Sequence, residues 1–177
     1  VSTLMIVIIV ASLLLSSSSA TVLAFAPDLV RHGSASANAG EGSFGRQMCI
    51  DQTNNNLFVV ATVNPGKVIK FDIATRSRTS VATFNLLDAN PTACSYEPSA
   101  NMVYTSIIDT LLLIPGKVIK VNAATMSRVG AVSFGLLQFQ SHANALDPAT
   151  ATPTYIYFSI EGIPSKISRI TLSSFSY

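Results

Sequence analysis

Apolar and polar positions alternate in short runs along most of this chain, and turn residues separate the runs. Runs rich in β-branched and aromatic residues stand at residues 57–62 ("LFVVAT"), 102–107 ("MVYTSI") and 155–160 ("YIYFSI"). Such runs are typical of β-strands. No long stretch after residue 30 has helical periodicity, so the pattern predicts an all-β fold.

One phrase recurs along the chain at a nearly constant interval. "PGKVIK" occupies residues 65–70 and again 115–120, and a weaker copy, "PSKISR", occupies residues 164–169. The spacings are 50 and 49 residues. Internal repeats of this length indicate propeller blades or solenoid coils.

Each repeat can be divided into four predicted strands. The first strand ends in an acidic turn residue, namely Asp51, Glu97 or Asp147, which we expect to cap that turn. The second strand is the β-branched run, and the third ("KVIKFD", "KVIKVN", "KISRIT") has apolar residues on both faces, as in a strand between stacked sheets. The fourth is "RTSVATF" or "RVGAVSF". Between the second and third strands, "PG" predicts a type II turn with a positive φ at Gly66.

The predicted repeat units cover residues 46–84, 92–134 and 142–177. Residues 31–37 ("RHGSASA") align with "RVGAVSF" and are predicted to be a stray fourth strand, whereas the last unit stops at Tyr177 before its own fourth strand. In a propeller, the ring closes when a strand from one terminus completes the sheet formed by the other terminus. Known propeller rings have more than three blades. The sequence therefore predicts part of a propeller, either a fragment or a protomer that completes a ring by association.

Residues 1–26 differ from the rest of the chain. An apolar run at residues 4–15 is followed by serines and small residues, which is the order of a secretory signal peptide. Cleavage fits after Ala20 and, less well, after Ala26. Alternatively, the uncharged residues 4–26 are long enough to serve as an uncleaved membrane anchor. The segment has neither an initiator methionine nor basic residues. We expect residues 27–177 to be secreted or displayed at the cell surface, with a signal peptide favoured over an anchor.

Composition narrows the possible partners. Hydrophobic residues make up 49% of the chain, charged residues 11%, and the formal net charge is +2. These values argue against a disordered chain and against a nucleic-acid partner. The expected partners are a protein or an extracellular ligand, and the remaining blades of the same protein or a second copy. A membrane would be contacted only through an uncleaved N-terminal segment.

Cys49 and Cys94 lie in apolar runs and are expected to be free thiols, although one bridge is possible in an exported protein.

The repeats resemble the YVTN-type β-propeller repeats of secreted and cell-surface proteins. The resemblance lies in "PGKVIKFDIATRSR", "PGKVIKVNAATMSRVGAVSF", "PSKISRITLSSF" and "RHGSASANAGEG", and it covers nearly everything after residue 31. It implies a propeller fold and, in most such proteins, an interaction platform. Related propellers include lactonases and other enzymes, so the resemblance does not decide function.

Few residues depart from the repeat in a way that suggests chemistry. Lys67, Lys117 and Lys166 each follow the hairpin turn and would form a basic rim, suited to an anionic ligand or simply to solubility. Arg31, Arg78 and Arg128 begin fourth strands and are interpreted as guards of exposed sheet edges. His32 and His142 stand far apart without metal-ligand spacing. No catalytic, cofactor-binding or metal residue is predicted.

One irregularity interrupts the repeat. The middle unit has eleven positions from Tyr104 to Pro115, where the first has seven from Phe58 to Pro65, and the added segment is strongly apolar. If it projects from the rim, it forms an exposed contact patch; if a neighbour covers it, it is a lengthened hairpin. The residues of this possible patch are Ile107, Ile108, Leu111, Leu112 and Leu113.

The sequence leaves two functional hypotheses open. The first is an exported β-propeller module that acts as a binding or structural platform and carries no catalysis in this segment. The second is part of a lactonase-like or hydrolase-like propeller enzyme whose active residues lie on blades outside this sequence. The absence of a polar cluster that breaks the repeat favours the first.

Overall fold

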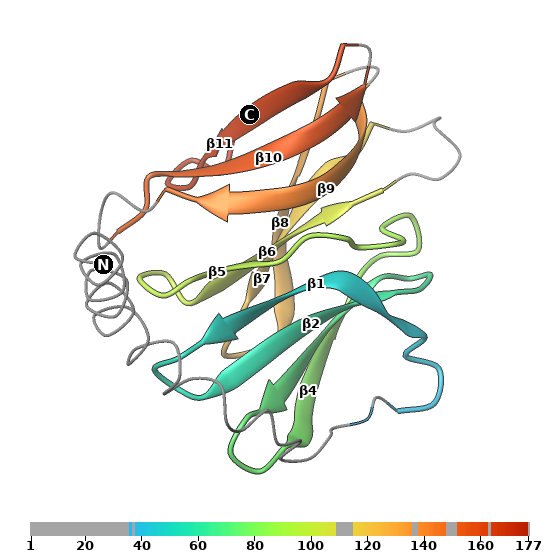
Figure 1. Cartoon of the computed structure of the whole chain (residues 1–177), viewed down its shortest axis with the longest axis vertical. Helices are drawn as coiled ribbons and strands as arrows, with labels where there is room; N and C mark the ends of the chain where they lie inside the picture. The colour runs from blue at the N-terminus through green and yellow to red at the C-terminus, as the bar shows by residue number, and fades with distance from the viewer. Residues whose placement is uncertain are drawn as a thin grey trace, which may run out of the picture. The chain divides into compact units, whose positions relative to one another are not determined.

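The described part of the chain consists of three antiparallel β-sheets (Figure 1). The computed structural model describes residues 36, 38–108, 115–135, 138–147, 152–162 and 164–176, all within one compact unit, Ala35–Tyr177. No helix occurs in these residues, so the all-β prediction is confirmed.

Each sheet is built from strands that follow one another in sequence. The first sheet contains β1 (Ser43–Asp51), β2 (Asn56–Thr62), β3 (Lys67–Asp72) and β4 (Ser77–Thr83). The second contains β5 (Ser95–Glu97), β6 (Met102–Ile107), β7 (Lys117–Asn122) and β8 (Ser127–Ser133). The third contains β9 (Gln138–Leu146), β10 (Tyr155–Gly162) and β11 (Lys166–Thr171). The predicted second and third strands are confirmed almost residue for residue, whereas β1 and β9 begin earlier than predicted.

The sequence repeat is also a repeat of hydrogen-bonding register. Lys67 pairs with Thr83 in the first sheet and Lys117 with Ser133 in the second, and the register shifts at the same place, after Lys70 and after Lys120. Equal spacing in the sequence therefore gives the first and second sheets the same strand pairing.

The turn after each third strand is repeated as well. Arg76, Met126 and Phe175 occupy equivalent positions in the three units, and each has a positive φ, of 55°, 51° and 46°. In the third unit Ser176 bridges back to Thr171, as Ser77 pairs with Asp72 in the first. The third unit thus reaches the residue at which a fourth strand begins in the other two.

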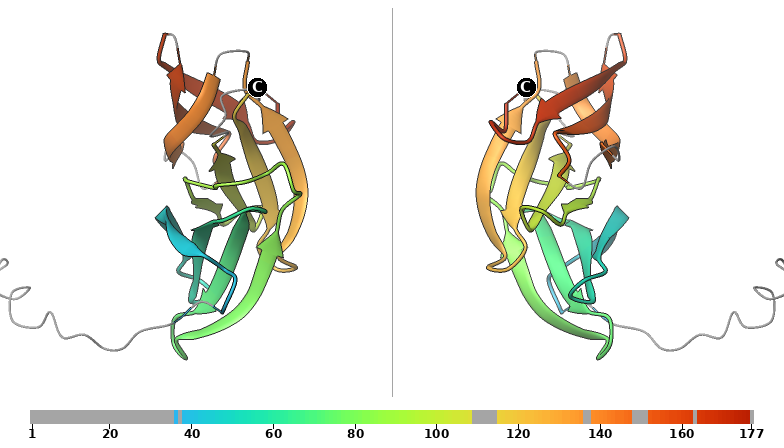
Figure 2. Two further views of the ribbon diagram at one scale, coloured as in Figure 1. Left: turned by 90° about the vertical axis from the view of Figure 1, so that its right-hand side faces the viewer. Right: turned by 90° about the vertical axis from the view of Figure 1, so that its left-hand side faces the viewer.

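The sheets stack face to face in sequence order and form two shared cores. One core joins the first and second sheets and includes Phe58, Val68 and Ile119; another joins the second and third and includes Tyr104, Val118 and Phe158. A third cluster, including Val59, Ile69 and Phe71, belongs to the first sheet alone. Adjacent residues of β3 and β7 thus face different clusters, as predicted for third strands buried on both sides. Figure 2 shows β4 and β8 along one side of this stack and β1 on the other.

The predicted type II turn at "PG" is wrong. Gly66 is not among the residues with a positive φ, and the Asn64–Pro65 peptide bond is cis. The reason for glycine is steric: a Cβ at Gly66 would lie 2.6 Å from the Asp88 carbonyl oxygen and 2.7 Å from Pro91 Cδ. Glycine is needed here because the hairpin packs tightly against the next connection, not because of its own dihedral angles.

The expectation of two free thiols is also wrong, because Cys49 and Cys94 form a disulfide. Cys49 lies on β1, and Cys94 comes immediately before β5. Stacking of the sheets brings β1 and β5 together, with a Cα–Cα distance of 5.4 Å between the cysteines. Both cysteines lie at the shared core of these sheets. Their predicted apolar surroundings are therefore confirmed, although their pairing was not expected.

Several sequence predictions fall outside the described residues. These are the signal peptide or anchor at residues 1–26 and most of the stray strand at residues 31–37. Within the described residues, no helix is long and apolar enough to cross a membrane.

Candidate functional site: the connector rim

Three equivalent turns lead into the first strands of the three sheets. In each, a backbone N–H bonds to the carbonyl oxygen three residues earlier: Glu41 to Asn38 (3.1 Å), Asp88 to Asn85 (2.9 Å) and Gln138 to Gly135 (3.2 Å). We call these turns the connectors. The repeat therefore extends beyond the strands to the chain that joins them.

The connectors are tied to the "PG" hairpins. The Gly66 N–H donates to the Asp88 carbonyl oxygen at 2.8 Å, and the Gly116 N–H donates to that of Gln138 at 2.8 Å. The carbonyl oxygens of both glycines accept bonds from the residues that end the fourth strands, Phe84 and Phe134. Hairpins and connectors thus share one edge of the stack, the connector rim.

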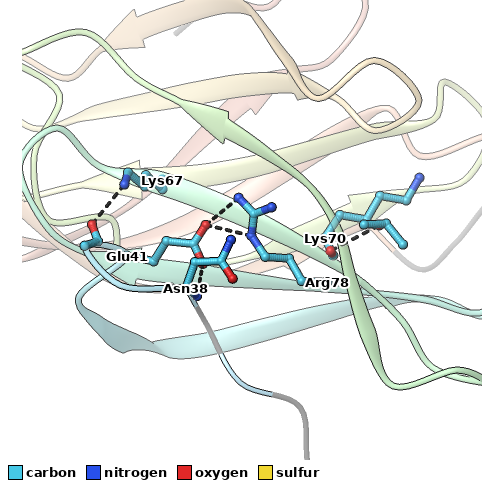
Figure 3. Close-up of polar contacts among 7 residues, drawn as sticks. Asn38, Glu41, Lys67, Lys70 and Arg78 are labelled. Atoms are coloured by element: carbon cyan, nitrogen blue, oxygen red, sulfur yellow. Dashed lines mark hydrogen bonds and ion pairs between the residues drawn. The ribbon is translucent and has the colours of Figure 1, made fainter.

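A buried ion pair holds the first connector against the first sheet. Glu41 is 3% exposed, and its Oε1 accepts a hydrogen bond of 2.7 Å from Arg78 Nε (Figure 3). Its Oε2 accepts a second bond, of 2.7 Å, from the Asn38 N–H. Burial alone would raise the pKa of Glu41, but these bonds and the nearby charges of Arg78 and Lys67 bring it below its ordinary value. Glu41 is therefore a structural anion.

The second connector repeats this arrangement. Asp88 is 1% exposed, and its Oδ1 accepts a 2.7 Å bond from Lys117 Nζ, while Arg128 Nε lies 3.2 Å from Oδ2. The interpretation of Arg78 and Arg128 as edge guards is therefore wrong, because both guanidinium groups pair with connector carboxylates. Arg31 lies outside the described residues. The third connector has Gln138 at this position, and its Oε1 lies 3.3 Å from the Gly135 N–H.

The rim lysines share a location but differ in environment. Lys67 Nζ donates to the Gly40 carbonyl oxygen at 3.0 Å, Lys117 pairs with Asp88, and Lys166 is exposed. Two of the three ammonium groups therefore hold connectors of their own sheets. Binding of an anionic ligand by this rim stays a prediction.

The predicted apolar patch is wrong for two of its five residues. Ile107 and Ile108 are 2% and 9% exposed. Ile107 ends β6 and belongs to the shared core, and the Ile108 N–H donates to the Asn90 carbonyl oxygen at 3.3 Å. Leu111, Leu112 and Leu113 lie outside the described residues.

Exposed apolar side chains on the rim come instead from the second connector. Leu86 and Leu87 are 76% and 73% exposed, side by side in the turn that ends at the anchored Asp88. They were not predicted from the sequence. A signal was present, since "F-x-L-L" occurs at residues 84–87 and again at 134–137, 50 residues apart.

The remaining candidate residues have structural roles or undescribed side chains. Asp51 accepts bonds from the backbone N–H groups of Thr53 and Asn54, and Glu97 from the hydroxyl groups of Ser99 and Tyr104, so both close the turn after a first strand, as predicted. His32 and the side chain of His142 are not described. Among the described side chains, no group of three or more His, Cys, Asp or Glu could hold a metal ion.

Comparison with known proteins supports the architecture. No family model and no curated protein matches the sequence. The structure is similar to hydrazine synthase of Kuenenia stuttgartiensis, with a TM-score of 0.60, 10% identity, and coverage of 73% of this chain and 34% of that chain. It is also similar to the β-propeller domain of Cps50 (Swd1) from Myceliophteria thermophila, with a TM-score of 0.53, 14% identity, and coverage of 73% and 36%. The three sheets are propeller blades.

These similarities show the fold alone, because both identities are low. The chain spans about a third of the length of either neighbour. That the repeats are of the YVTN type stays a prediction.

Proposed function

We propose that this chain is an exported β-propeller module that binds a partner protein through the connector rim. The observation that carries the proposal is the pair of adjacent leucines, Leu86 and Leu87, each about three-quarters exposed. Burying a leucine side chain contributes about 1.5–3 kcal/mol, so a partner that covers both leucines would gain a few kcal/mol of binding free energy. Exposed apolar groups with polar surroundings are characteristic of protein contact sites.

The connector presents these leucines rigidly. Asp88, the next residue, is fixed by Lys117 through its side chain and by Gly66 through its carbonyl oxygen. A preorganised contact loses less conformational entropy on binding than a free loop does. The charged groups beside the leucines would supply the polar border of the interface.

The disulfide supports export. Structural disulfides persist in oxidising compartments and are rare in the cytosol. Cys49 and Cys94 join two blades, at a position where the bridge stabilises the stack. This agrees with the signal-peptide interpretation of residues 1–26.

A photo-crosslinking experiment tests the proposal. A photoreactive residue placed at Leu87 should yield a defined adduct with one protein of the extracellular fraction, other than the chain itself. The same residue at Val129, which is 51% exposed on β8, is the control. Excess unlabelled wild-type chain should abolish the adduct, and a Leu86→Ser, Leu87→Ser double variant should compete at least about tenfold less well.

Because both leucines are exposed, the double variant should unfold at the same urea concentration as the wild type. The proposal is wrong if positions 87 and 129 give the same adducts, or if the double variant competes as well as the wild type.

A further inference from the structure

The third connector differs from the other two in the charge of one side chain. Glu41 and Asp88 occupy equivalent positions in the first and second connectors, are 3% and 1% exposed, and each pairs with basic groups of the sheet that follows it. Gln138 holds this position in the third connector and is 6% exposed. An amide carries no charge, so the third connector brings no carboxylate to the rim at this position.

Gln138 keeps the local hydrogen bond of this position. The Asn38 N–H donates to Glu41 Oε2 at 2.7 Å, and the Gly135 N–H donates to Gln138 Oε1 at 3.3 Å. In both connectors the donor lies three residues before the acceptor. The glutamine therefore preserves the turn but supplies no anion to the third sheet.

The lysine that follows this connector has no carboxylate partner among the described residues. Lys166 begins β11, as Lys67 begins β3 and Lys117 begins β7. Lys117 Nζ lies 2.7 Å from Asp88 Oδ1, and Lys67 Nζ donates to the Gly40 carbonyl oxygen at 3.0 Å. Lys166 is exposed, and within the described part of the chain no ion pair includes it. The third sheet thus repeats the cation of the first two without its anion.

A fourth strand beside β11 would not cover this ammonium group. Lys67 pairs with Thr83 of β4 and Lys117 with Ser133 of β8, and both ammonium groups still reach their connectors at the rim. The charge of Lys166 therefore lies at the rim whether or not another strand pairs with β11.

Lys166 lies on the same rim as the exposed leucines. The connector that carries Leu86 and Leu87 is held by the pair between Asp88 and Lys117 of the second sheet. Lys166 begins the equivalent strand of the third sheet, and stacked sheets lie about 10 Å apart. An extended chain advances about 3.3 Å per residue, so about three residues of a bound segment span that distance.

We propose that Lys166 binds an acidic side chain of the partner protein, about 10 Å from the apolar group that covers Leu86 and Leu87. The proposal rests on the proposed function of the connector rim and names the chemistry of its partner: an extended segment with an apolar and an acidic residue about three positions apart. The partner's carboxylate takes the place that Glu41 and Asp88 hold in the other connectors. An exposed ion pair adds little affinity, so its main effect is to select an acidic partner.

Crosslinking tests whether Lys166 contacts the partner that covers the leucines. A photoreactive residue in place of Lys166 should capture the same protein as the one at position 87. The control is the same residue in place of Arg76, which is exposed in the turn after β3, at the end of that strand away from the rim. Capture of a different protein from position 166, or of the same protein from positions 166 and 76 alike, would overturn the proposal.

Competition tests the charge. Unlabelled Lys166→Gln chain should compete for the position 87 adduct about two- to fivefold less well than the wild type at low salt, and the difference should shrink as salt is added. Arg76→Gln removes the same charge away from the rim and should compete like the wild type. The proposal fails if Lys166→Gln competes as well as the wild type at low salt, or if both variants lose equally.

Gln138→Glu tests the position without the partner. The new carboxylate should pair with Lys166 as Asp88 pairs with Lys117, so Gln138→Glu should raise the urea midpoint more in the wild-type background than in the Lys166→Gln background. It should also weaken competition about two- to fivefold, but only when Lys166 is present. Independent effects of the two substitutions on unfolding would contradict the placement of Lys166 beside this connector position.

The proposed function and this proposal fail in different ways. Without a specific adduct at position 87, the binding role of the rim is wrong and the role of Lys166 falls with it. A specific adduct at position 87 that does not depend on Lys166 would leave the rim as a binding site and would overturn the acidic partner alone.

Discussion

Replacing Gly66 by alanine should destabilise the protein by about 2–4 kcal/mol. The new Cβ would lie 2.6 Å from the Asp88 carbonyl oxygen, 2.7 Å from Pro91 Cδ and 3.0 Å from a ring carbon of Phe84. Overpacking costs about 1–3 kcal/mol, and moving the hairpin away would weaken the 2.8 Å bond from the Gly66 N–H to Asp88, which contributes about 1 kcal/mol. The first of these obstacles is backbone, so no side-chain rotation relieves it.

Urea unfolding measures this cost. With a slope of about 2 kcal/mol per molar urea, the midpoint should fall by about 1–2 M. Gly135→Ala is the control, because its Cβ would come no closer than 3.6 Å to the Gln138 side chain, and it should change stability by less than about 1 kcal/mol.

Gly66→Asn separates the steric account from a turn requirement. Asparagine tolerates a positive φ, so it would be the milder substitution if the turn were type II, and it should be at least as harmful as alanine if space is limiting. A loss below about 1 kcal/mol for alanine, or an asparagine variant more stable than the alanine variant, would refute the reasoning.

Three further predictions concern the disulfide and two titrating groups. Cys49→Ala, Cys94→Ala should lower the unfolding free energy by up to about 4 kcal/mol, from the entropy of a loop closed over 45 residues, measured against the oxidised wild type in urea. The pKa of Glu41 in the folded protein lies below its ordinary value of 4.5, so its contribution to stability is present above pH 4.5 and is lost as the pH falls through the folded pKa. Glu41→Gln should therefore flatten the fall in unfolding free energy on the acid side. An unchanged dependence of unfolding free energy on pH would contradict the role of Glu41 as a structural anion. Burial and the Asp51 charge raise the pKa of Tyr96 to about 12, so the folded protein should show one tyrosine titrating near that pH by tyrosinate absorbance, and Tyr96→Phe should remove it.

The strands were predictable because their signals are local. A β-branched run bounded by turn residues specifies a strand without reference to the rest of the chain, and the 50-residue interval transfers each assignment to the next unit. The third strands β3, β7 and β11 were placed to the residue. The acidic turn residues Asp51 and Glu97 followed from the same local chemistry.

The candidate site was predicted less well, because its contacts join segments far apart in sequence. Arg78 pairs with Glu41 across 37 residues, and Lys117 with Asp88 across 29. No residue near Arg78 or Lys117 in the sequence indicates which carboxylate the side chain pairs with. Their interpretation as edge guards or as a free basic rim used only the strand on which each lies.

The amino-acid sequence alone determined the all-β class, the four-strand unit seen in the first two sheets and the interval of about 50 residues between units, because periodicity and turn chemistry are properties of short segments. Stacking of the sheets decided the rest. It brought Cys49 to Cys94, it made Gly66 a point of close packing, and it buried Ile107 while leaving Leu86 exposed. Each of these contacts depends on which residues of one sheet face the next sheet. The distances between those residues are fixed only when the sheets pack.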